Sequence, residues 1–198
     1  MRQLLFTRIA LLTLLMVAAL NVWAAHPAQA RIENATDKVL KALRADSSQI
    51  YTLVDKVVLP LFDFARMSKL VLGKNWKRAN RDQKIRFVKA FRDLLVRTYA
   101  MGLVEAAGQI DRIEYSSRAR SSKRATVRSK VYQKGIATPI DVNYSMYYYG
   151  GKWKVYNVSI GGVSLVTTYR TEFTNDIRTM GMNGLINKLE KKSRKKIK

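Results

Sequence analysis

The segment Trp153–Phe173, WKVYNVSIGGVSLVTTYRTEF, changes its hydrophobic period halfway along, and this change limits the folds open to the chain. Its first part, Trp153–Ile160, is crowded with β-branched and aromatic residues, which is typical of a strand. Two glycines follow, and Ser164 is then placed to cap a helix. Beyond it the apolar residues recur every three or four positions, as in the buried stripe of a helix: Leu165, Val166, Tyr169 and Phe173. The sequence therefore predicts a strand that passes through a glycine corner directly into a helix.

The residues before this corner indicate more strands. Thr138–Tyr149 alternates between apolar and polar side chains, and Gly150-Gly151 after it fits a two-residue hairpin turn. Ile110–Tyr115 and Ala125–Tyr132 are two further candidate strands. We predict an α+β fold in which a four-stranded antiparallel sheet is covered by several helices.

The helices that precede the sheet are recognised by their apolar periods and caps. The first is predicted over Ala35–Arg44, and a second is capped by Ser47 or Ser48 and interrupted at Pro60. Asp63 caps a third, which ends at Gly73. Asn80 and Gln83 form a capping box for the longest helix, predicted over 81–107. Two short helices broken at Gly181 are expected to finish the chain.

Residues 1–30 have the features of a secretory signal peptide. Arg2 and Arg8 supply positive charge, Ile9–Leu20 is almost unbroken apolar sequence, and Ala28-Gln29-Ala30 fits the small-x-small pattern of a cleavage site. The apolar run has 12 residues, fewer than the roughly 20 that span a bilayer. An uncleaved anchor reaching Trp23 is the alternative. We expect cleavage after Ala30, which leaves residues 31–198 as a single exported domain.

The chain is strongly basic, with 37 Lys and Arg against 14 Asp and Glu. Without Arg2 and Arg8, the mature part keeps 35 basic residues and a net charge of +21. In a cytoplasmic protein this charge would suggest nucleic acid. An exported protein meets anionic membrane surfaces and acidic proteins instead, so we expect no nucleic-acid partner. The densest basic run, Lys188–Lys198, is interpreted as a frayed helix end with a solvated face.

Two residue types are missing from the predicted mature part. The chain contains no cysteine, and its one histidine is His26. Disulfides, the usual zinc sites and Ser-His-Asp or Cys-His catalysis are therefore excluded from residues 31–198. A carboxylate pair or a Ser-Lys dyad stays open, although no local spacing indicates either. We expect no cofactor, no metal and no enzymatic activity.

Several short pieces of the mature sequence match one known family in order and spacing. They are Leu72-Gly73 with Trp76, Phe87 with Phe91, the run 94–100, Trp153–Tyr156, Gly162–Val166, Tyr169-Arg170 with Phe173, and Gly181 with Gly184-Leu185-Ile186. On these residues the chain resembles the MlaC family, also called Mla or toluene-tolerance phospholipid-binding proteins. It departs from the family where Tyr-Asp-Val is usual, because it carries Asn157 in place of the aspartate. A role that needs that carboxylate is not carried over.

The resemblance implies a monomeric periplasmic carrier with phospholipid as its ligand. Such a carrier shuttles phospholipid between an outer-membrane lipoprotein complex and an inner-membrane ABC transporter complex, in transient contact with the membranes, and so maintains outer-membrane lipid asymmetry. The physics agrees in one respect. At about 0.8 kcal/mol per buried methylene, two acyl chains need an apolar cavity worth more than about 10 kcal/mol.

We expect this cavity to lie between the sheet and the helices. The candidate lining residues are Val142, Tyr144, Met146, Trp153, Val155, Val163 and Leu165 on the sheet side and Leu61, Met67, Leu70, Leu95 and Tyr99 on the helix side. The phosphate is expected near the mouth, where Arg97, Lys154 or Arg170 could bind it. Each of these residues could equally serve as ordinary core or solvated surface, and Tyr147-Tyr148-Tyr149 could pack across strands or face a membrane.

Two other classes of protein also fit the sequence. An exported enzyme acting on a hydrophobic substrate in the same cavity would need a buried carboxylate, with Asp141 and Glu105 as the first candidates. A basic interaction protein without a cavity would bind anionic surfaces by charge alone. Salt distinguishes this protein from the carrier, since surface attraction weakens with ionic strength and enclosed acyl chains do not respond.

Overall fold

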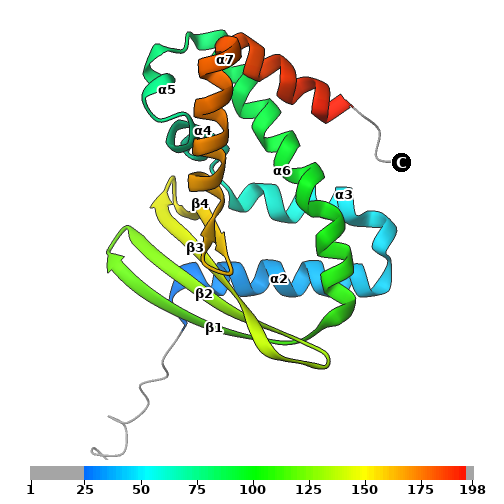
Figure 1. Ribbon diagram of the computed structural model, residues 1–198. Coiled ribbons are helices and arrows are strands. Elements are labelled where there is room, and N and C mark those ends of the chain that lie inside the picture. The colour runs from blue at the N-terminus through cyan, green and yellow to red at the C-terminus, as the bar shows by residue number, and fades with distance from the viewer. Residues whose placement is uncertain (1–24, 195–198) are drawn as a thin grey trace, which may run out of the picture.

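The predicted glycine corner is the point at which the sheet and the last helix of this protein meet. The computed structural model describes residues 25–194, and in it β4 (Lys152–Ile160) turns at Gly161-Gly162 into the two-residue strand β5 (Val163–Ser164). β5 leads directly into α7 (Leu165–Arg194), which rises from the sheet to the opposite end of the molecule (Figure 1). The predicted passage from strand to helix is confirmed.

The sheet is an antiparallel meander with the order β1-β2-β3-β4-β5. The first three strands are β1 (Ile110–Ser121), β2 (Arg124–Gln133) and β3 (Ile136–Tyr149). Gly150 and Gly151, which join β3 to β4, have φ angles of 56° and 75°. The hairpin turn therefore has the positive φ values that its sequence predicts. The prediction of four strands is correct apart from β5, which pairs with the end of β4.

An irregularity in β4 lets three of its residues face the same core. Tyr144 of β3 pairs with Val158, whereas Met146 pairs with Val155, so β4 has one extra residue between these pairs. Such a bulge shifts the alternation of a strand by one position. As a result Trp153, Val155 and Val158 are all buried, although strict alternation would expose one of them.

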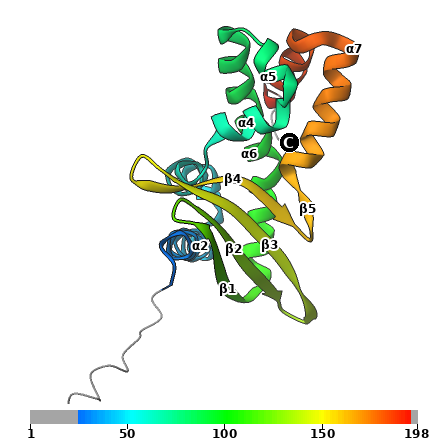
Figure 2. The same cartoon turned by 90° about the vertical axis from the view of Figure 1, so that its left-hand side faces the viewer.

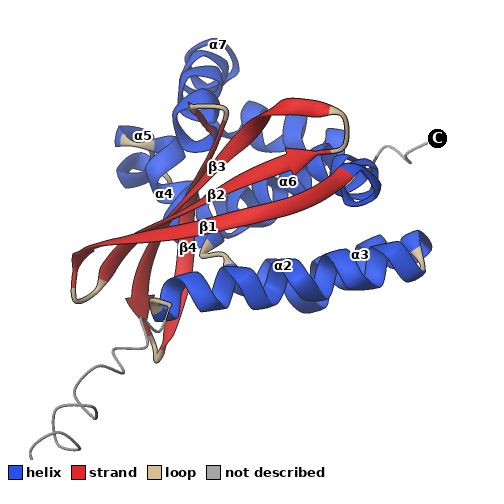
Figure 3. Ribbon diagram, turned by 90° about the horizontal axis from the view of Figure 1, so that it is seen from below, coloured by secondary structure: helices blue, strands red, loops and turns tan. Residues whose placement is uncertain are grey.

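Most of the helices precede the sheet, and two of the longer ones cross each other. α2 (Pro27–Ala45) lies along the sheet, and a hairpin takes the chain back through η2 (Ser47–Gln49), α3 (Ile50–Leu53), η3 (Val54–Val58) and η4 (Leu59–Leu61) (Figures 1 and 3). α4 (Phe64–Leu72) and α5 (Lys74–Arg78) follow, and then α6 (Arg81–Gln109) passes across the hairpin to reach β1. None of the helices within residues 25–194 is long and apolar enough to span a bilayer.

The caps of these helices agree with the sequence at two of three places. The Asp63 carboxylate accepts a hydrogen bond from the Arg66 N–H, and Asn80 and Gln83 form the complete capping box. The segment after α2 is capped by Asp46, whose carboxylate accepts from the Ser48 N–H, so the prediction of a Ser47 or Ser48 cap is wrong. A carboxylate outcompetes a hydroxyl here because it can accept several bonds at once.

Both ends of the described chain are more ordered than the sequence suggests. α2 begins at Pro27, within the predicted leader and ahead of the expected start at Ala35. At the other end, α7 extends to Arg194, and Leu189 within the basic run is 1% exposed. Lys188 contacts Asp176 at 2.7 Å, which ties this run to the helix before the Gly181 kink. The leader up to Ala24 and the last four residues lie outside the described residues.

The core is divided into three clusters. The helical cluster is formed by α4, α6 and α7 around Phe87, Phe91 and Phe173. The sheet cluster joins one face of the sheet to the start of α2 and includes Val127 and Met146. A third cluster joins α2 and the α3 segment to the lower half of α6. Figure 2 shows the sheet and α2 in one part of the molecule and α4, α5 and α7 in the other. α6 contributes to two clusters, which explains its wide apolar stripe.

The corner between β4 and α7 is held by Asn157. Its Oδ1 accepts hydrogen bonds from the Ser164 hydroxyl at 3.1 Å and from the Val166 N–H at 3.2 Å. The Ser164 hydroxyl in turn accepts from the Thr167 N–H at 3.3 Å, so the predicted cap is present. Asn157 adds a second cap from a neighbouring strand. Both bonds need an acceptor oxygen and not a charge, so the amide of an asparagine is sufficient for this task.

We predict that Asn157→Leu lowers the free energy of unfolding by about 1–2 kcal/mol, since two donors at the helix start lose their acceptor. Asn157→Asp keeps the oxygen and adds negative charge at a helix N-terminus, so its stability should equal or exceed that of the parent protein. Urea unfolding of the three proteins measures both effects. An equal loss in both variants would contradict the capping role.

Candidate functional site

The predicted sheet-side lining forms one apolar surface. Met146, Trp153 and Val155 are buried in the sheet cluster, and the half-buried Val142 and Tyr144 pack against it. Leu165 also contacts this cluster from the start of α7. Val163 differs from the others, because it lies at the β4–β5 turn and is 60% exposed. The structure therefore brings together all of the sheet-side residues except Val163.

The predicted helix-side lining lies in the helical cluster. Met67 and Leu95 are buried there, and Leu70 and Tyr99 pack against them. Leu61 is half-buried at the end of η4, next to Phe62. The two groups of predicted lining residues thus belong to two separate clusters. The side chains of each cluster fill its interior.

Phe62 and Leu165 are half-buried residues that contact both of these clusters. Phe62 is fixed to the sheet by a bridge to Val155, and the Asp63 N–H donates to the Val155 carbonyl at 2.9 Å. Leu165 is fixed by the capped corner. These two side chains define the junction between the helical and sheet clusters, and we call this place the junction.

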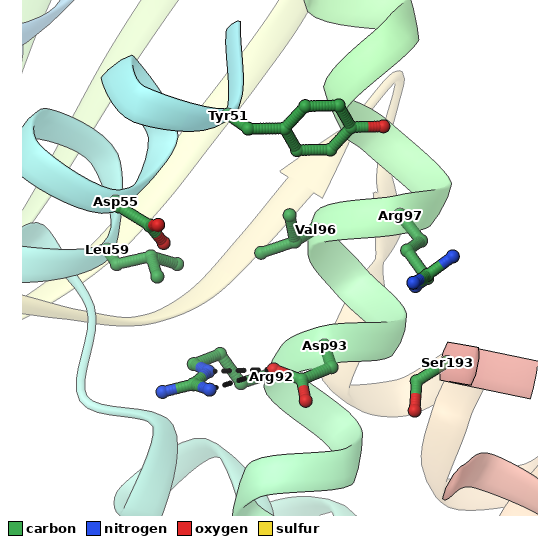
Figure 4. A pocket seen from close by; sticks show the side chains of 8 residues that line it. All are labelled: Tyr51, Asp55, Leu59, Arg92, Asp93, Val96, Arg97 and Ser193. Carbon is green, nitrogen blue, oxygen red and sulfur yellow. Dashed lines mark hydrogen bonds and ion pairs between the residues drawn. The ribbon is translucent and has the colours of Figure 1, made fainter. Parts of the chain in front are cut away.

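A groove of about 470 Å³ opens between the α3–η4 segment and α6 (Figure 4). This volume falls within the range of small-molecule sites, roughly 300–1,000 Å³. Leu59 and Val96 give the groove apolar walls, while the charged side chains around them come mainly from α6. The eight lining residues are Tyr51, Asp55, Leu59, Arg92, Asp93, Val96, Arg97 and Ser193. The groove is therefore lined by both apolar and charged side chains, as in an amphipathic site.

The three predicted headgroup cations occupy different environments. Arg97 lines the groove. Lys154 donates to the Pro60 carbonyl at 2.6 Å, and the Arg170 Nε donates to the Leu70 carbonyl at 2.8 Å. The structure therefore does not bring the three cations together, and two of them hold backbone carbonyls.

A polar cluster joins α4 to the hairpin end of the sheet. The Tyr147 hydroxyl donates to the Asp63 carboxylate, and the Arg66 guanidinium lies 4.0 Å from the centre of the Tyr147 ring. Burial, together with the bond to Asp63, raises the pKa of Tyr147. For the run Tyr147-Tyr148-Tyr149 the sequence left open whether the side chains pack across strands or face a membrane. In the structure Tyr147 is 8% exposed, whereas Tyr149 is 69% exposed. Contacts with Asp63 and Arg66 at α4 and with Tyr156 of β4 bury Tyr147, whereas Tyr149 lies open to solvent.

The outer face of the sheet carries a second hollow, about 760 Å³ in volume and lined by polar side chains of β1, β2 and β3. Asp141 lies in this hollow and is exposed, and Glu105 is exposed on α6. Neither residue is the buried carboxylate that the enzyme alternative requires.

Comparison with known proteins identifies the family. A protein-family model described as "MlaC protein" matches residues 33–191. The chain belongs to the MlaC family. The predicted family resemblance is thereby confirmed.

Three relatives extend the comparison. The intermembrane phospholipid transport system binding protein MlaC of Haemophilus influenzae is 25% identical over 169 residues, covering 80% of this chain and 78% of the relative. The toluene tolerance protein ttg2D of Pseudomonas putida is 28% identical over 180 residues, covering 86% and 82%. The structure of a phospholipid-binding protein from Ralstonia solanacearum, solved in complex with a phospholipid, matches with a TM-score of 0.76 and 30% identity, covering 85% of this chain and 97% of that one.

Sequence reasoning missed most of the groove, and of the two junction residues it predicted Leu165 but not Phe62. Of the predicted site residues, Arg97 is the one that lines the groove. A signal was present in α6, where the charged residues Arg92, Asp93 and Arg97 and the apolar Val96 lie one helical turn apart and so share one side of the helix. Phe62 gave no such signal, because its importance depends on a bridge to Val155, which is distant in the sequence.

Two half-buried tyrosines near the sheet cluster make this MlaC-family fold sensitive to high pH. Burial raises the pKa of Tyr144, and burial raises the pKa of Tyr115 to about 12. A tyrosine whose folded pKa lies above its unfolded value of 10.0 keeps its proton in the folded state when the unfolded chain has lost it. Its stabilising contribution is complete below pH 10 and is lost as the pH rises toward 12.

We predict that Tyr115→Phe removes part of this alkaline loss. Between pH 10 and pH 12, the parent protein should lose about 1 kcal/mol more unfolding free energy than the variant, because the variant has no hydroxyl to ionise and water screens part of the effect at this half-buried position. Urea unfolding of both proteins at several pH values measures the contribution of Tyr115, because the two proteins differ in that residue alone. Parallel pH curves for the two proteins would contradict this assignment.

Proposed function

We propose that this MlaC-family protein is a periplasmic phospholipid carrier. It moves phospholipid between an outer-membrane lipoprotein complex and an inner-membrane ABC transporter complex, and so maintains the lipid asymmetry of the outer membrane. The observation that carries the proposal is the Ralstonia neighbour, a protein of the same fold that holds a phospholipid. The name of the Haemophilus relative, a binding protein of an intermembrane phospholipid transport system, supports the same function.

The energetics of acyl chains explain why such a carrier needs two apolar surfaces. Each methylene that leaves a membrane must find an equivalent apolar environment, worth about 0.8 kcal/mol. The helical and sheet clusters supply such surfaces on the two sides of the junction. Lipid chains inserted at the junction would replace contacts of Phe62 and Leu165 with contacts of their own. Met67 and Met146, one in each cluster, have flexible side chains that can adapt to chains of different shape.

The charged side chains of the groove suit the lipid phosphate. Arg97 lines the groove beside Arg92, whose guanidinium contacts Asp93 at 2.9 Å. An arginine can bind a phosphate through two parallel hydrogen bonds, which gives orientation as well as attraction. Lys154 and Arg170 are not among the residues that line the groove, so Arg97 is our first candidate for the headgroup.

The two alternative functions receive less support. The enzyme alternative lacks a mechanism at its two candidate carboxylates, since Asp141 and Glu105 are exposed. The basic interaction protein needs no enclosed ligand, yet the related Ralstonia protein holds one. The charge of the chain suits a carrier equally well, because a carrier must approach anionic membranes.

Native mass spectrometry of the protein, exported to the periplasm and purified in high salt, tests the proposal. We expect about one bound phospholipid per chain that stays bound in high salt, because apolar burial is not screened by ions. A bare polypeptide that also takes up no phospholipid from vesicles would overturn the carrier and favour the basic interaction protein.

A matched pair of variants tests the position of the acyl chains. Leu165→Gln places an amide at the junction, and we expect it to weaken lipid binding by about 1–3 kcal/mol, or roughly fivefold to 150-fold. Val163→Gln introduces the same amide two residues away at an exposed position and should leave lipid content unchanged. Circular dichroism melting of both variants confirms that each is folded. Equal lipid loss in both would place the acyl chains elsewhere.

A further inference from the structure

We propose that His26–Ala30 belong to the mature protein, so that the leader is removed on the N-terminal side of His26 and not after Ala30. The small-x-small pattern Ala28-Gln29-Ala30 predicts cleavage at Ala30, but the structure places these residues in the first turn of α2. The inference rests on their packing and does not depend on the proposed lipid function.

The start signals of α2 all lie before Ala30. His26 is the N-cap, and its Nδ1 accepts a hydrogen bond from the Ala28 N–H at 3.2 Å. The His26 carbonyl accepts from the N–H groups of Gln29 and Ala30 at 2.7 and 3.1 Å. Pro27 occupies the first helical position, where its fixed φ favours a helix and its missing N–H costs nothing. A chain beginning at Arg31 would lose the cap together with the first turn.

The same turn closes one end of the sheet cluster. Ala28 is completely buried there, with Ile32 one turn later, among residues that include Trp153 and Val155. The edge of the His26 ring meets Trp153, with the ring centres 5.0 Å apart. Removal of these residues would expose apolar surface of Trp153 and its neighbours to water. The turn therefore serves as a wall of the sheet cluster.

The sequence offers small residues for a cleavage site directly before His26, at Ala24-Ala25. Charge does not distinguish the two cleavage points, because each places an α-ammonium group at the start of a helix, where the helix dipole presents its positive end.

Intact-mass measurement of the full-length chain, exported in a Gram-negative host, tests the proposal directly. We expect a mature mass that includes all five residues from His26 to Ala30. A mature chain that begins at Arg31 would overturn the proposal.

Two glutamine variants give an independent test with two readouts. Ala28→Gln and Ala30→Gln both replace a small residue of the pattern, so both should stall processing if cleavage follows Ala30. If the turn is retained, both variants are processed normally and differ in stability. Ala28→Gln, at the buried position, should then lower Tm by about 4–10 °C, whereas Ala30→Gln, which is half-buried, should shift it by less than about 2 °C. Accumulated precursor in both variants, or equal Tm values, would overturn the proposal.

Discussion

The arrangement of this protein depends on the hydrogen bonds that Asn157 makes across the corner between β4 and α7. One side-chain oxygen in a strand receives donors from Ser164 and from the first turn of the helix. These bonds fix the direction in which α7 leaves the sheet, and α7 carries Tyr169 and Phe173 into the helical cluster. They also fix Leu165, which contacts both clusters at the junction. A local polar contact thus sets the relation between the two halves of the molecule.

The bulge in β4 complements this corner. Because β4 has one extra residue opposite β3, Val158 joins Trp153 and Val155 on the buried face, and the polar Asn157 falls at the position from which it can reach α7. β4 therefore contributes apolar side chains to the sheet cluster, and near its end it also contributes Asn157, which forms hydrogen bonds to the start of α7. The irregularity is what allows one strand to do both.

Local chemistry made much of the fold predictable from the sequence. The Gly150-Gly151 turn, the Asn80–Gln83 capping box, the Asp63 cap and the Ser164 cap all depend on residues a few positions apart, and each is present. The features that the sequence did not predict depend on distant partners. His26 meets Trp153, and Phe62 pairs with Val155, so neither contact is visible in a local pattern. The groove was missed for a related reason, since it needs the α3–η4 hairpin to lie against α6.

The division of the core has a kinetic consequence for the proposed carrier, which would take up and release its ligand at the junction. In a single continuous core, opening a cavity breaks many contacts at once, and the barrier approaches that of global unfolding. Here the helical and sheet clusters each keep their own fully buried centre, Phe91 on one side and Val155 on the other. Separation at the junction leaves the β-ladder and the helix backbones hydrogen-bonded. Amide protons in the centres of both clusters can therefore stay protected from exchange while the junction opens and closes many times.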